Sequence, residues 1–193
     1  HDSVYPVSQT GSTGMAFEAG ASGKNLTEWQ FGMASLNPRW NVSGTYMQVL
    51  PSFISTDQDG NDEKEFLLDY FNELPDLLSM VFLKGYQWPF DVNKIFGGSS
   101  VIDLLVYQET VLKKRRVFLD YRVNPGNLEK DRDLPYASMI PEAKEYLSQA
   151  GACFGTPIER LKHMNEPAIL FYQDHHVDLF KERLEIAVCA QHN

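Results

Sequence analysis

The sequence predicts an α+β fold, in which helices and short strands are mixed without regular alternation. Segments rich in β-branched and aromatic residues lie among segments whose apolar residues recur at helical spacing. No Gly-x-Gly-x-x-Gly turn follows a predicted strand, so the sequence has no site for the ADP half of a dinucleotide. Of the 193 residues, 43% are hydrophobic, which is enough to fill a core.

The first 61 residues predict one helical segment and two strands. A turn-rich stretch leads into small, helix-compatible residues at 15–21. Residues 28–33 and 45–54 carry β-branched and aromatic side chains, which favour strands. Residues 57–61 read Asp-Gln-Asp-Gly-Asn and predict a turn after the second strand.

Helical spacing dominates the middle of the chain. Apolar residues recur at this spacing over residues 62–84, and Pro75 is expected to divide the segment into two helices. Two Gly and two Ser residues precede the apolar run 101–112. For this run a helix capped by Ser99 or Ser100 is favoured over a strand.

The remaining elements are two strands and three helices. Residues 117–121 predict a strand, and Pro141 begins a helix that ends near Gly151. Residues 156–159 combine an N-cap, a first-turn proline and a capping-box Glu, which begin the next helix. A further helix is predicted to begin at residues 165–167, and residues 184–190 predict the last strand.

Charge and composition exclude several partners. The net charge is −9, from 26 acidic and 17 basic side chains, which disfavours nucleic acids and anionic membrane surfaces. The basic run at 113–116 is too short for a nucleic-acid-binding arm. No apolar stretch is long enough for a transmembrane helix, and we expect a cytoplasmic protein. Cys153 and Cys189 lie among small or apolar neighbours and are expected to be buried free thiols.

Three places carry residues suited to chemistry. The turn at 10–14 could approach an anion or a flat ring closely, although a plain turn into a helix fits it as well. The basic cluster at 113–116, followed by Arg122, could bind carboxylates, or could be a solvated turn. His192 follows an apolar strand and could bind a carboxylate or transfer a proton. The pair His175-His176 lacks further ligands of metal spacing, so no metal is expected.

Taken in order, these places resemble the flavoproteins of the succinate dehydrogenase/fumarate reductase group, which includes L-aspartate oxidase. The family has a Tyr-Pro-x-Ser/Thr stretch, a Thr-Gly-Asp-Gly turn, a helix ending Ala-Gly-Ala, and a strand ending Glu-Phe-x-Gln-Phe-His-Pro-Thr. These are followed by a catalytic Arg ahead of a Tyr-Leu-Asp strand and by a His-x-x-Gly-Gly segment. The corresponding residues are Tyr5-Pro6-Val7-Ser8, Thr10-Gly11-Ser12, Ala19-Gly20-Ala21, Glu28-Trp29-Gln30-Phe31, Lys114-Arg115-Arg116 before Val117-Phe118-Leu119-Asp120, and Gln191-His192-Asn193.

The resemblance implies an internal piece of an FAD-dependent oxidoreductase that acts on a small acidic substrate. It implies three segments: residues 1–45 in the FAD-binding domain, 46–183 as a capping domain, and 184–193 as the return strand. The residues it implies for substrate binding and catalysis are Arg115, Arg116 and His192. Those it implies along the flavin are Ser8, Thr10, Gly11 and Ser12. The ADP-binding fold would lie in the remainder of the flavoprotein chain, so this piece alone is expected to retain FAD weakly and to be inactive.

Two departures from the family pattern keep other readings open. The family's His-Pro-Thr is replaced by Gly32-Met33-Ala34. The Gly-Arg-Gly surroundings of the catalytic Arg are also absent, so Lys114, Arg115 and Arg116 are competing candidates. A substrate other than fumarate or succinate is therefore favoured. The alternatives are a non-catalytic binding domain of a degenerate family member and an unrelated α+β domain.

Overall fold

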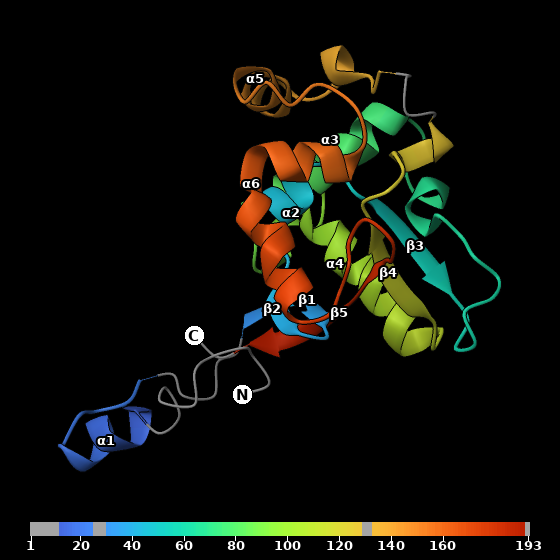
Figure 1. Cartoon of the computed structure of the whole chain (residues 1–193). Helices are drawn as coiled ribbons and strands as arrows, with labels where there is room; N and C mark the ends of the chain where they lie inside the picture. Colours follow the sequence, from blue (N-terminus) through green and yellow to red (C-terminus); the bar gives the residue numbers. More distant parts are fainter. Residues whose placement is uncertain (1–11, 25–29, 129–132, 192–193) are drawn as a thin grey trace.

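The computed structural model describes residues 12–24, 30–128 and 133–191, and it confirms the α+β class (Figure 1). Its strands form one sheet, in the order β2-β1-β5-β4-β3, and all neighbouring strands are antiparallel. The strands are β1 Gln30–Leu36, β2 Arg39–Asn41, β3 Ser52–Thr56, β4 Arg116–Asp120 and β5 Leu184–Gln191.

The helices gather mainly on one side of this sheet, except that α1 stands away from the rest of the molecule (Figure 1). The α-helices are α1 Ser12–Glu18, α2 Thr45–Gln48, α3 Leu74–Lys84, α4 Ser100–Tyr107, α5 Pro141–Gln149 and α6 Pro157–Asp174. Short 3₁₀ turns occur at η2 Phe66–Asp69, η3 Val92–Lys94, η5 Pro125–Asn127 and η6 Tyr136–Ser138, and a π-helical turn, η4 Gln108–Leu112, extends α4.

The two faces of the sheet have different roles, because successive side chains of a strand point to opposite faces. One face packs against the helices and supplies core residues from four strands: Met33, Phe53, Val117, Leu119 and Ile186. Residues of the alternate positions line a pocket on the opposite face: Leu36, Thr56, Arg116, Phe118 and Glu185. The sheet thus separates the hydrophobic core from a solvent-accessible polar face.

The strand predicted at 45–54 is wrong in its first half. Residues 45–48 form the short helix α2, and β3 begins only at Ser52. Gly44 precedes α2 with φ 59°, a conformation that favours glycine, and its carbonyl accepts hydrogen bonds from the N–H groups of Met47 and Gln48. Met47 is fully buried in the core, so tertiary packing outweighs the strand propensity of this stretch.

The helices of the middle region are partly as predicted. The first predicted helix is reduced to the turn η2, and Pro75 lies in the first turn of α3, where its missing N–H removes no helical bond. The helical reading of 101–112 is confirmed by α4 and η4. Ser99 is the N-cap residue of α4, as one of the two alternatives predicted, but its side chain makes no capping hydrogen bond to the helix. Instead, the Ser99 hydroxyl donates to Gln87 Oε1 at 2.9 Å.

The last third agrees with the prediction. α5 begins at Pro141, and α6 begins after a capping box in which the Thr156 N–H donates to the Glu159 carboxylate at 2.9 Å. Asn165 has non-helical angles and divides α6 where a new helix was predicted to begin. The final strand is β5.

Other sequence expectations meet mixed outcomes. Both cysteines are free, and Cys189 is buried, but Cys153 is exposed, so the expectation of a second buried thiol is wrong. In the described part of the chain, no helix is both long enough and apolar enough to span a bilayer. The single sheet draws strands from all three predicted segments, and the segment boundaries themselves remain a prediction.

Candidate functional site

The predicted flavin-lining residues lie mostly outside the described part of the chain. Ser8, Thr10 and Gly11 precede it, and His192 follows it. Ser12 is the first residue of α1, and only its backbone is described. Of the predicted site residues, the structure therefore places Arg115 and Arg116 with their side chains.

Arg115 is held between structural partners. Its guanidinium donates to Asp62 Oδ2 at 2.7 Å and to Ser55 Oγ at 3.2 Å, and Glu109 Oε2 lies 3.3 Å from its Nε. These contacts join η4, the start of β4, the end of β3 and the turn that follows it. Because Arg115 bridges four segments and is only 13% exposed, its contacts fit a structural role.

Lys114 and Arg116 differ from Arg115. Lys114 is exposed and has φ 55°, and its carbonyl accepts from Gln58 Nε2. Arg116 begins β4 on the polar face of the sheet and is one of the residues that line the pocket. The structure thus separates three adjacent candidates, of which Arg116 alone is among the residues lining this pocket.

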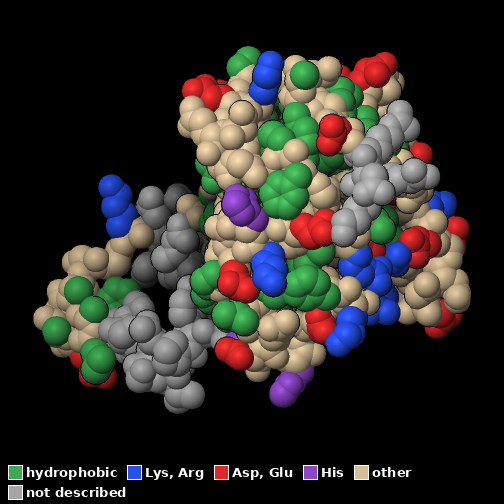
Figure 2. Space-filling model, turned by 45° about the horizontal axis from the view of Figure 1, so that its top comes forward, with side chains coloured by type: hydrophobic (Ala, Val, Ile, Leu, Met, Phe, Trp, Pro, Cys, Tyr) green, Lys and Arg blue, Asp and Glu red, His purple; other side chains and the backbone are tan. Residues whose placement is uncertain are grey.

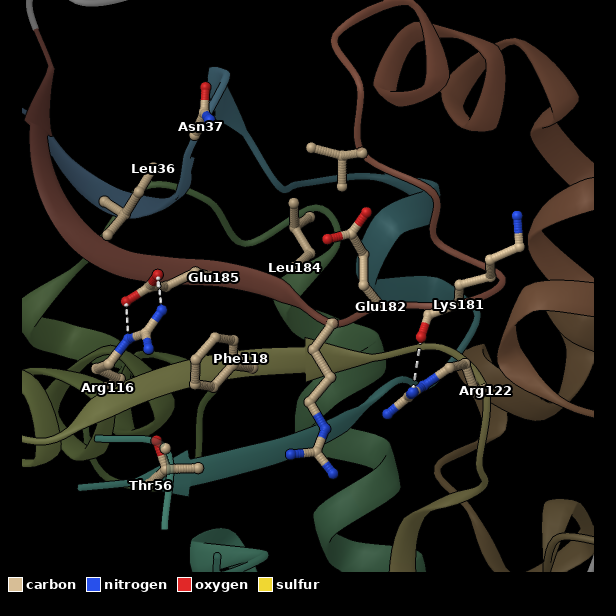
Figure 3. A pocket seen from close by; sticks show the side chains of 13 residues that line it. Leu36, Asn37, Thr56, Arg116, Phe118, Arg122, Lys181, Glu182, Leu184 and Glu185 are labelled. Atoms are coloured by element: carbon tan, nitrogen blue, oxygen red, sulfur yellow. Dashed lines mark hydrogen bonds and ion pairs between the residues drawn. The ribbon is translucent and has the colours of Figure 1, made fainter. Parts of the chain in front are cut away.

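Arg116 forms a two-pronged ion pair with Glu185 on the neighbouring strand. Its Nε and Nη2 donate to the two carboxylate oxygens at 2.9 and 2.7 Å (Figure 3). The guanidinium also lies 5.0 Å from the ring centre of Phe118. The hydrogen bonds from Arg116 to Glu185 raise the pKa of Arg116 above its ordinary value, so the side chain stays charged.

The pocket on the polar face of the sheet is large enough for a small molecule. Its volume is about 530 Å³, within the range of ligand sites. Strands β4 and β5, the segment leading into β5 and the β1–β2 turn surround it (Figure 3). The lining residues with charged side chains are Arg116, Arg122, Lys181, Glu182, Arg183 and Glu185, and the apolar ones are Leu36, Phe118, Val177 and Leu184.

Asp120 organises two of the pocket arginines. Its side chain is 1% exposed, and its oxygens accept from Arg122 Nε and Nη2 at 2.9 and 2.7 Å. Oδ2 also accepts from Arg183 Nε at 2.9 Å. Arg183 Nη2 reaches Glu63 at 2.6 Å, and Arg122 Nη1 donates to the carbonyl of Lys181 at 2.9 Å, which Figure 3 shows as a dashed line. One buried carboxylate thus fixes the direction of two guanidinium groups.

Opposing effects act on the Asp120 carboxyl. Burial alone would raise its pKa, but the hydrogen bonds from Arg122 and Arg183 together outweigh burial and hold the pKa below its ordinary value. Asp120 is therefore ionised at neutral pH. Arg122 and Arg183 share this buried anion, and Glu63 supplies the second negative charge through Arg183.

The start of β1 and the end of β5 lie side by side in the sheet. β1 and β5 are antiparallel neighbours, and Gln30 pairs with Gln191. The pair Val117–Ile186, next to Arg116, lies five positions before Gln191. This corresponds to about 17 Å along an antiparallel strand. The pocket and the Gln30–Gln191 pair therefore mark opposite ends of β5.

The described histidines have structural contacts. His163 Nε2 lies 2.9 Å from the carbonyl of Ala150, and His175 Nδ1 lies 2.7 Å from the carbonyl of Phe171 in the last turn of α6. Within residues 12–24, 30–128 and 133–191, no group of three or more His, Cys, Asp or Glu side chains could hold a metal ion.

Sequence reasoning missed two members of the arginine–carboxylate cluster. It singled out Arg122 but not Asp120 or Arg183. The period of two along β4 places Arg116, Phe118 and Asp120 on one face and could have indicated Asp120. Arg183 is 63 positions from Asp120 in the sequence, and only the pairing of β4 with β5 brings them together.

Lysine and arginine side chains also form a visible group on the surface. Figure 2 shows such a group on one face of the molecule, bordered by acidic side chains.

Comparisons with protein-family models, with curated proteins and with solved structures found no match.

Proposed function

We propose that this chain is part of an FAD-dependent oxidoreductase of the fumarate reductase/succinate dehydrogenase type, in which it covers the flavin and binds an acidic substrate. The pairing of β1 with β5 carries this proposal. The family-like motif at 8–12 precedes β1 in the sequence, and His192 directly follows β5. The Gln30–Gln191 pair joins the two flanking segments to the sheet at one point. A lid domain inserted into a flavin-binding domain needs this connectivity.

The described residues fit one half of such an enzyme. FAD would supply hydride transfer at its N5 atom, and the protein would bind and orient the substrate. The described segments contain no glycine-rich strand–helix turn for the ADP moiety, so another part of the protein must hold it. The contribution of this chain is then the lid and the groups that hold an acid.

Of the three adjacent candidates Lys114, Arg115 and Arg116, Arg116 is the one placed to contribute to the acid site, because it lines the pocket. Its fork can bind a carboxylate through two parallel hydrogen bonds, as it now binds Glu185. The raised pKa favours a permanently charged binding group over a proton donor. Arg115, in contrast, is committed to Asp62, Ser55 and Glu109.

The visible absorption spectrum tests this proposal. The longest natural protein that contains these residues should show flavin absorption near about 450 nm after purification or after incubation with FAD. The 193-residue chain, treated identically, should be colourless, because it lacks the ADP-binding fold. If the longer protein stays colourless with added FAD, the oxidoreductase proposal is wrong.

A binding domain without catalysis is the second candidate. The pocket favours it, since Asp120 holds two arginines in place and no flavin is needed to form the pocket. Anaerobic addition of candidate acids to the flavin-loaded longer protein separates the two functions. The acids are added both to the oxidised flavin and to flavin that dithionite has first reduced. Loss of absorption in the first case, where the acid donates electrons, or its return in the second, where the acid accepts them, indicates catalysis, whereas an unchanged spectrum in both cases together with acid binding indicates a binding domain.

A further inference from the structure

The pocket contains guanidinium hydrogens that are left over after its internal ion pairs. A guanidinium has five N–H donors. Among the described residues, Arg122 uses three in its side-chain bonds to Asp120 and Lys181, which leaves two. Arg183 uses two, on Asp120 and Glu63, which leaves three. The side chains of Arg122 and Arg183 are 34% and 23% exposed, so the remaining donors can meet a ligand.

The unused guanidinium donors favour a ligand group that accepts two hydrogen bonds, such as a carboxylate. Four cationic residues line the pocket, against two acidic ones. Both acids have partners: Glu185 binds Arg116, and Glu182 accepts the Asp178 N–H at 2.8 Å. The cations are paired as well: Lys181 with Asp178, Arg122 with Asp120, and Arg183 with Asp120 and Glu63. The preference for a carboxylate therefore rests on the unused guanidinium donors and not on an excess of positive charge.

The apolar part of the lining narrows the class of anion. Phe118 lies between Arg116 and Arg122 on the floor of the pocket, and Leu36 stands on its wall (Figure 3). A fully hydrated inorganic anion would leave these side chains unused. A ligand with both a carboxylate and a flat apolar body would satisfy both kinds of surface.

We propose that this pocket binds a small organic acid, with its carboxylate on Arg122 and Arg183 and its flat apolar part against Phe118. Asp120 is a positioning residue, because it holds both guanidiniums in a fixed direction before the ligand arrives. Such an acid would be the substrate of the proposed oxidoreductase, and its role in a reaction rests on that proposed function. Binding itself requires no flavin, so the two can fail separately.

Benzoate tests the proposal, and benzamide is its neutral control of the same shape. Both are titrated into the 193-residue chain and followed by isothermal titration calorimetry and by amide chemical shifts. Benzoate is expected to bind with a dissociation constant of about 1 mM or lower, at least about tenfold more tightly than benzamide. Amide shifts should centre on β4 and on the start of β5.

Arginine variants test whether benzoate binds in this pocket. Arg183→Gln and Arg122→Gln are each expected to weaken benzoate binding at least about tenfold, because each removes one side of the fork. Lys162→Gln removes one positive charge from an exposed position of α6 and should leave binding unchanged. If a Gln variant loses its folded amide spectrum, Arg183→Lys replaces it, since that variant keeps the charge but lacks the planar fork.

Several results would overturn the proposal. Equal dissociation constants for benzoate and benzamide would show that the negative charge of the ligand plays no role in binding. This comparison needs no variant. Benzoate binding that is unaffected in folded Arg183→Gln and Arg122→Gln would place the site elsewhere. The absence of benzoate binding up to about 50 mM would exclude an acid site of this affinity class.

Discussion

At the level of single side chains, Asp120 holds both Arg122 and Arg183 on the polar face of the sheet. Asp120→Asn should lower the free energy of unfolding at pH 7 by about 2 kcal/mol, since charge-assisted bonds to Arg122 and Arg183 are lost. The folded-state pKa of Asp120 is depressed, so its stabilisation is complete above the unfolded value of about 3.9 and is lost as pH falls through the folded value. The difference in the free energy of unfolding between the two proteins, measured in urea, should therefore begin to narrow below about pH 4 and vanish below the folded pKa. A difference that stays constant down to pH 3 would contradict this account.

A second charged pair lies inside the core. Lys84 and Asp103 are essentially unexposed, with Nζ 2.5 Å from Oδ2, and the Lys84 ammonium also donates to the Gln87 carbonyl at 3.2 Å. Burial lowers the pKa of Lys84 and raises the pKa of Asp103, because it disfavours both charges, and the ion pair offsets this only in part.

Replacing one or both members of this pair should have opposite results. Asp103→Asn leaves a buried ammonium unpaired and should lower the free energy of unfolding by about 4 kcal/mol. The double variant Lys84→Met/Asp103→Leu removes both charges and should lie within about 1 kcal/mol of the parent or above it. Chemical denaturation of the parent, Lys84→Met, Asp103→Leu and the double variant measures the coupling, and Asp103→Asn is measured beside them. A double variant as unstable as Asp103→Asn would show that the pair itself stabilises the fold.

The individual residues of the candidate site could be predicted from the sequence only in part. The basic run at 113–116 drew attention from the sequence, but Arg115 and Arg116 could not be told apart there. Their difference arises because Arg115 lies just before β4 and pairs with Asp62, whereas Arg116 is the first residue of β4, where the pairing of β4 with its neighbours sets the face on which a side chain lies. Asp120 and Arg183 needed the same tertiary information.

Among the elements, β1 has an unusually close neighbour. A Cβ atom added to Gly32 would lie 1.9 Å from Trp88 Nε1 and 2.2 Å from Trp88 Cε2, and the Phe90 N–H donates to the Phe31 carbonyl at 2.6 Å. The segment carrying Trp88 therefore packs directly on the backbone of β1. The sequence marked Gly32 only as a departure from a family motif. Its structural reason is this contact.

Gly32→Ala should destabilise the protein by about 2 kcal/mol, because the indole ring must move away. Gly14→Ala in α1 is the matched control. No atom lies within 4 Å of its added Cβ, so its free energy of unfolding should change by less than about 0.5 kcal/mol. Thermal or urea unfolding followed by Trp fluorescence measures both. Equal stability of the two variants would mean that the Trp88 contact is absent in solution.

The secondary structure shows which elements a sequence can specify. β5, α5 and the kinked α6 were predicted because local signals act there: a first-turn proline, a capping box and a run of apolar residues. The strand predicted at 45–54 is wrong over residues 45–48, because Met47 packs into the core and Gly44 starts a helical turn. Where local propensity and tertiary packing agree, the sequence suffices. Where they conflict, packing decides.

In the molecule as a whole, the sheet divides two environments, with the core on one side and the arginine pocket on the other. The α+β class was predictable from composition and periodicity. The strand order β2-β1-β5-β4-β3 was not, because it places the first and last described strands side by side, which requires contacts between residues about 150 positions apart.

That adjacency also determines how the fold would respond to mechanical tension. A force applied between Gln30 and Gln191 would act across two hydrogen-bonded neighbours at the end where they pair. In an antiparallel ladder the hydrogen bonds lie perpendicular to the strands, so they would be loaded one after another, as in a zipper, and not all at once in shear. The molecule would therefore open at low force from this corner, with β1 peeling from β5, however stable the fold is to heat or denaturant.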